Sequence, residues 1–82
     1  MITYTKKEIK KAILKTFPVG RIFYRSQWED IKWHLILNDG FEQKGFLDEN
    51  TFFLAIGELR DTNHFERHRN PITKERFYIR IQ

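Results

Sequence analysis

The side chains best suited to chemistry in this chain are cations near its C-terminal end. Four of them lie within ten residues: Arg67, Arg69, Lys74 and Arg76. They flank a polar turn at Asn70-Pro71. A guanidinium group is planar and donates several hydrogen bonds, which suits phosphate oxygens and base edges alike. The alternative is that these charges only protect an edge strand from aggregation. Four cations within ten residues are more than such protection requires. We therefore predict contacts to a polyanion, mostly to its phosphates.

Two histidines, His64 and His68, lie in the same segment. On a strand they would share one side but stand about 13 Å apart. The chain has no cysteine and no convergent carboxylates to complete a ligand set, so we predict no metal site and no cofactor. It also lacks a glycine-rich phosphate loop, an HExxH motif and a GxSxG motif. We predict that the protein is not an enzyme.

A two-stranded hairpin is predicted to carry the four cations. Residues 64–69 and 76–81 are the expected strands on the two sides of the turn. The second strand alternates two sets of side chains: Phe77, Ile79 and Ile81 against Tyr78 and Arg80. Because successive strand side chains point to opposite faces, the alternation predicts that the first set packs on a core and the second meets solvent.

The first helix is predicted from a capping box. Thr5 is the expected N-cap and Glu8 the residue that reaches back to it. Pro18 and Gly20 end the helix. Five lysines cover much of its surface: Lys6, Lys7, Lys10, Lys11 and Lys15. Such a run is most often a solvated face, with an auxiliary phosphate contact as the alternative. Residues 21–25 then form a short predicted strand.

A second capping box, Ser26 to Glu29, predicts a helix that runs to about Leu37 and stops at residues 38–40. Its apolar residues form two sets: Trp28, Ile31 and Leu35, and on the other side Trp33, Ile36 and Leu37. A helix that is apolar most of the way round is central or part of an interface. Residues 41–47 are expected to form a connection folded back on the core.

The third helix is predicted over residues 51–62, with Asp48 or Asn50 as its N-cap. Its expected inner face is formed by Phe52, Ala55, Ile56 and Leu59. Its outer face holds Leu54, Gly57, Glu58 and Asp61. Because Glu58 and Asp61 would repel phosphates, only Asn50, Thr51 and Arg60 are expected to supplement a nucleic-acid contact.

Length and composition limit the architecture. Eighty-two residues accommodate one small domain, and aromatic residues, at 16% of the chain, supply a core without disulfides. No apolar run reaches the length of a membrane span, and lysines interrupt any signal-peptide core, so a cytoplasmic protein is the expectation. The net charge is +4, with basic ends (residues 1–28 and 62–82) and an acidic middle.

The predicted order is helix, strand, helix, helix, strand, turn, strand. With the segment Gly45-Phe-Leu-Asp-Glu-Asn-Thr-Phe-Phe-Leu-Ala-Ile-Gly-Glu-Leu59 leading into the hairpin, this order resembles the winged-helix superfamily. The resemblance covers nearly the whole chain and is one of pattern. It implies a single α+β domain over residues 1–82, with a three-helix core, a short first strand and a C-terminal β-hairpin wing. Helix and wing are the usual contact surfaces of that fold.

The resulting functional prediction is a small double-stranded DNA-binding protein, a regulator of transcription or replication. The expected contacts are Arg67, Arg69, Lys74 and Arg76, supplemented by Asn50, Thr51 and Arg60. The alternative is a protein-interaction module of the same fold, for example a phage or viral protein that binds a host complex. That module would use Leu54, Glu58 and Asp61. Trp33, Ile36 and Leu37 are the expected surface for self-association into a two-fold dimer.

Overall fold

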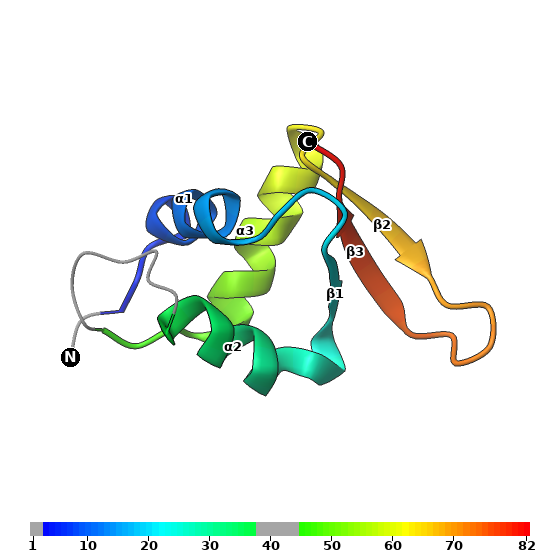
Figure 1. Ribbon diagram of the computed structural model, residues 1–82, viewed down its shortest axis with the longest axis horizontal. Helices are drawn as coiled ribbons and strands as arrows, with labels where there is room; N and C mark the ends of the chain where they lie inside the picture. The colour runs from blue at the N-terminus through cyan, green and yellow to red at the C-terminus, as the bar shows by residue number, and fades with distance from the viewer. Residues whose placement is uncertain (1–2, 38–44) are drawn as a thin grey trace.

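The computed structural model describes residues 3–37 and 45–82, which fold into an α+β arrangement. The elements, in chain order, are α1 (Lys6–Thr16), β1 (Ile22–Tyr24), the short 3-10 helix η1 (Arg25–Gln27), α2 (Trp28–Leu37), α3 (Glu49–Asp61), β2 (Phe65–Arg69) and β3 (Arg76–Arg80). The strands form an antiparallel sheet in the order β1-β3-β2, and the helices gather beside it (Figure 1). This layout is compatible with a winged helix. Within the described ranges, no helix has the length and apolar character of a membrane span.

The helix α1 begins at the predicted capping box. The Thr5 hydroxyl accepts a hydrogen bond from the Glu8 N–H at 3.2 Å, and the Glu8 carboxylate accepts one from the Thr5 N–H at 3.0 Å. Ile9, Ala12 and Ile13 form the buried side of the helix. The first capping box is therefore confirmed, because both of its reciprocal hydrogen bonds are present.

The second predicted capping box is wrong. Ser26 lies inside η1, and its N–H donates to the Glu75 carboxylate at 3.3 Å. Glu29 forms an ion pair with Lys32 instead of reaching back to Ser26. The physical reason is the pairing of β1 with β3 up to Tyr24, after which the chain turns directly into the 3-10 helix. No extended residue is left at Ser26 to act as a cap.

The helix α2 is described as far as Leu37, the last residue of the predicted helix, while the expected stop at residues 38–40 and the start of the connection at 41–44 lie outside the described residues. In the described part of the connection, Leu47 is buried and Phe46 is half exposed. The Phe46 carbonyl accepts a hydrogen bond from the Tyr4 N–H at 3.2 Å.

The N-cap of α3 is Asp48, which decides between the two predicted candidates. Its carboxylate accepts from both the backbone N–H and the hydroxyl of Thr51, each at 2.9 Å. These two bonds hold the pKa of Asp48 below its ordinary value, the backbone bond first. The predicted inner face is confirmed and gains one member: Phe52, Phe53, Ala55, Ile56 and Leu59 are all buried.

The facing predicted for the last strand is wrong. Phe23 and Phe65 are fully or almost fully buried, and they stand directly opposite Tyr78 and Arg80 of β3. Directly opposite residues share one face of an antiparallel sheet. Tyr78 and Arg80 therefore face the helices, while Phe77 and its neighbours at positions 79 and 81 belong to the outer face.

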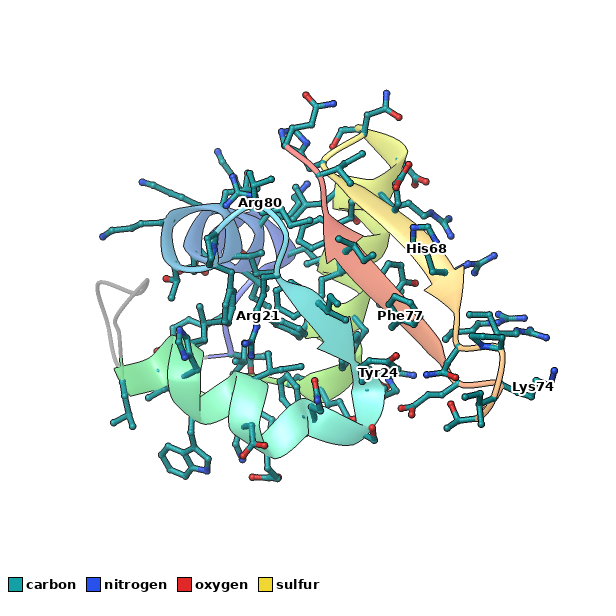
Figure 2. All side chains as sticks on the ribbon, turned by 45° about the vertical axis from the view of Figure 1, so that its right-hand side comes forward. Arg21, Tyr24, His68, Lys74, Phe77 and Arg80 are labelled. Carbon is teal, nitrogen blue, oxygen red and sulfur yellow. The ribbon has the colours of Figure 1, made fainter. Side chains whose placement is uncertain are left out.

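Arg80 faces the helices because its guanidinium group binds the end of α1. The Arg80 guanidinium donates to the carbonyl of Leu14 at 3.0 Å and to the carbonyl of Phe17 (Figure 2). Carbonyls in the last turn of a helix have no partner within the helix itself. Arg80 thus closes the C-terminal end of α1 and joins it to the sheet.

On the outer face, three rings lie side by side across the three strands. The Phe77 ring centroid is 4.8 Å from that of Tyr24 and 5.6 Å from that of His68. Figure 2 looks onto this face, with α3 behind the strands. His68 is therefore a partner of Phe77, and its Nε2 also lies 3.3 Å from the Glu66 carboxylate.

Candidate nucleic-acid interface

A groove separates the first turns of α3 from the ribbon formed by β2 and β3. Its volume is about 490 Å³, within the range of ligand-binding clefts. The lining residues come from η1, α3 and both strands of the ribbon: Arg25, Asn50, Phe53, Leu54, Arg67, Arg76 and Tyr78. An apolar floor with three guanidinium groups is therefore open to a ligand from solvent.

The arginines of the ribbon lie on the same face as the core. Arg67 stands opposite Tyr78, and Arg69 stands opposite Arg76. Near the base of the ribbon this face is covered by helices, but further along it borders the groove. A smaller hollow of about 200 Å³ continues along the ribbon and is lined by Arg67, His68, Arg69 and Arg76.

The guanidinium groups of Arg25, Arg67, Arg69 and Arg76 have no carboxylate partner among the described residues. The ion pairs found there involve other cations: Lys6, Lys10, Lys32, Arg60 and His68. The direct opposition of Arg69 and Arg76 places like charges across the ribbon, which is unfavourable for folding. An anion bound in the hollow that both arginines line would reduce this repulsion, so the arrangement favours a phosphate-bearing ligand.

Sequence reasoning missed Arg25. Its guanidinium carbon lies 4.4 Å from the centroid of the Phe53 ring, in cation–π geometry. In the sequence, Arg25 only ends a predicted strand, and nothing in its spacing relates it to Arg67. It joins the groove because η1 turns the chain towards the start of α3.

Two side-chain hydrogen bonds hold the ribbon against the body of the protein. The Asn70 amide donates to the Tyr24 hydroxyl at 3.3 Å, and the Ser26 N–H donates to Glu75 at the same distance. The Asn70 side-chain oxygen also accepts from the N–H groups of Ile72 and Thr73, at 2.8 and 3.1 Å. Hydrogen bonds therefore fix the turn internally and join this end of the ribbon to β1 and η1.

The structure brings together only some of the predicted DNA contacts. Arg67, Arg76 and Asn50 line the groove, and Arg69 lines the adjoining hollow. The others lie elsewhere. Lys74 is in the turn at the tip of the ribbon (Figure 2), Thr51 is engaged by the cap of α3, and Arg60 is 3.4 Å from Asp61 at the far end of that helix.

The residues predicted for a protein partner are also separated. Leu54 is 61% exposed and lines the groove. Glu58 is held by two lysines of α1, with its oxygens 2.6 Å from Lys6 Nζ and 2.9 Å from Lys10 Nζ. The expected repulsion of phosphates by Glu58 is therefore largely cancelled. Asp61 remains exposed beside Arg60.

This ion-pair cluster predicts a pH dependence of stability. Hydrogen bonds from Lys6 and then Lys10 lower the pKa of Glu58 to about 2, from an ordinary value of 4.5. As the pH falls, the unfolded chain binds a proton at this group before the folded protein does. The stabilisation is therefore complete above about pH 5 and is lost towards pH 2.

We expect Glu58→Gln to lower stability at pH 7 and to flatten its decline between about pH 5 and pH 2. Urea unfolding at a series of pH values measures this decline. Glu66→Gln, which removes a carboxylate from the outer face of the ribbon, is the control. Parallel curves for wild type and Glu58→Gln would show that the two lysines do not act through this carboxylate.

A separate apolar surface lies on α2. Trp33, Ile36 and Leu37 are 52%, 37% and 76% exposed, whereas Ile31 and Leu35 of the same helix are fully buried. The two predicted sets of this helix are thus divided between surface and core, with Trp28 packed against Phe52 and Phe53. Self-association through the exposed set stays a prediction.

The chain was also compared with known proteins. No protein-family model matches it, and neither a curated protein nor a solved structure matches it with statistical significance.

Proposed function

We propose that the chain is a winged-helix protein that binds double-stranded DNA and regulates transcription or replication. In this proposal α3 is the recognition helix and the β2–β3 ribbon is the wing. The observation that carries the proposal is the groove between them, where Arg25, Arg67 and Arg76 converge without a carboxylate partner among the described residues.

The groove offers the two kinds of contact that duplex recognition requires. Phosphate oxygens would accept hydrogen bonds from the three arginines, which position the duplex. Asn50, in the first turn of α3, presents an amide that can pair with the edge of an adenine, and Leu54 can contact a thymine methyl group. The lysines that hold Glu58 reduce the negative charge beside this surface.

The alternative of a protein-interaction module has less support. It relied on an acidic and partly apolar surface formed by Leu54, Glu58 and Asp61. Glu58 is engaged by α1, and Leu54 borders a basic groove instead of an acidic surface. A basic partner protein would therefore meet the arginines first, and like charges would oppose its binding.

The proposal is tested by titrating a labelled duplex with the protein at several salt concentrations and following fluorescence anisotropy. Each neutralised phosphate contributes a slope of about −0.9 to a plot of log affinity against log salt, so three arginines predict a slope of about −2.7. The absence of binding at about 50 mM salt would overturn the proposal. Tighter binding to a single-stranded oligonucleotide of the same length would identify single-stranded nucleic acid, and not the duplex, as the ligand.

A further inference from the structure

The exposed side of α3 carries a glycine that the fold does not require. Gly57 lies within the helix, where glycine is the least favourable residue after proline. A Cβ built at this position would meet no atom within 4 Å, and the backbone is not in the left-handed region. Gly20 is different: its φ of +93° lies in the left-handed region, which explains why a glycine occupies that position. Neither conformation nor crowding within the described residues accounts for Gly57.

The position of Gly57 connects it with the groove. It lies one helical turn beyond Phe53 and Leu54, which both line the groove. Gly57 adds no side chain to the surface that leaves the groove along α3, and Asp61, one turn further on, is exposed and lies 3.4 Å from Arg60. Glu58, the acidic neighbour of Gly57, is turned to α1 by Lys6 and Lys10. A large ligand held by the arginines can thus come close to the helix backbone here.

We propose that Gly57 is the point where the sugar–phosphate backbone of a bound duplex crosses α3. The inference rests on the proposed function and adds a specific close contact to it. Glycine allows a ligand to approach the protein backbone more closely than any other residue does. A polyanion is the occupant that fits, because Arg25, Arg67 and Arg76 line the adjoining groove and can donate hydrogen bonds to phosphates.

The test is Gly57→Ala, which should change stability and binding in opposite directions. The melting temperature should rise by roughly 4–8 °C, because alanine favours the helix and its methyl group has free space in the protein alone. Affinity for the duplex should fall roughly tenfold, because the same methyl group overlaps the bound backbone. The salt slope should stay nearly constant, since no cation is removed.

Asn63→Gly is the control, because it changes the end of α3 without adding atoms to the exposed side of the helix. Asn63 has a φ of +65°, which glycine adopts readily, and duplex affinity should be unaffected. If Gly57→Ala raises the melting temperature but leaves affinity unchanged, the inference is overturned while the proposed function stands. If the unmodified protein does not bind duplex DNA at low salt, the inference and the proposed function are both overturned. A lower melting temperature for Gly57→Ala would refute the premise that the fold has no use for this glycine.

Discussion

Replacing Arg67 and Arg76 with alanine together is expected to weaken duplex binding by about two orders of magnitude. Both guanidinium groups line the groove and neither has an ion-pair partner among the described residues. A hydrogen bond to a charged group contributes about 1.5 kcal/mol or more, and each replacement removes at least one such bond. The log–log salt slope should shrink by about 1.8, because two phosphates are no longer neutralised.

The matched control is the double replacement of Lys7 and Lys11 with alanine. It removes the same charge from exposed positions of α1 and should leave the salt slope nearly unchanged. Equal losses in the two double variants would mean that overall charge, and not the groove, drives binding. Thermal unfolding separates binding from folding, since Arg76 opposes Arg69 across the ribbon and its removal should not lower the melting temperature.

Replacing Phe23 with alanine is expected to lower the free energy of unfolding by about 3–5 kcal/mol. Phe23 is fully buried in β1, and its ring lies 4.9 Å from that of Phe17 and 5.5 Å from that of Phe65. Domains of this size have a total stability of about 5–15 kcal/mol, so much of it would be lost. Urea unfolding followed by tryptophan fluorescence measures the change.

Phe77→Ala tests which face of the sheet forms the core. Phe77 lies on the outer face, where its ring contacts those of Tyr24 and His68. Loss of such cross-strand contacts should cost about 1 kcal/mol. The alternation of the last strand, taken alone, predicts instead that Phe77 is a core residue. If Phe77→Ala were as damaging as Phe23→Ala, the facing in the structure would be wrong.

Local signals in the sequence determined most of the secondary structure. The capping box at Thr5 and Glu8 and the cap at Asp48 act within three residues, so they operate wherever the chain lies. The three helices and the hairpin with its turn after Asn70 follow from such short-range patterns and from apolar periodicity. The same patterns identified Arg67 and Arg76 as basic residues of one ribbon.

Only the tertiary structure decided which side chains meet. Which side of β3 faces the core depends on the pairing of this strand with Phe23 and Phe65 in the other strands. Both sides of β3 carry enough apolar side chains to face the core. The charge of Glu58 is cancelled by Lys10, 48 residues away along the chain. Arg25 enters the groove for the same reason: a distant element, α3, brings Phe53 beneath it. Pairing and packing between distant residues carry no local signature, so neither the facing of the sheet nor the membership of the groove could be predicted from spacing alone.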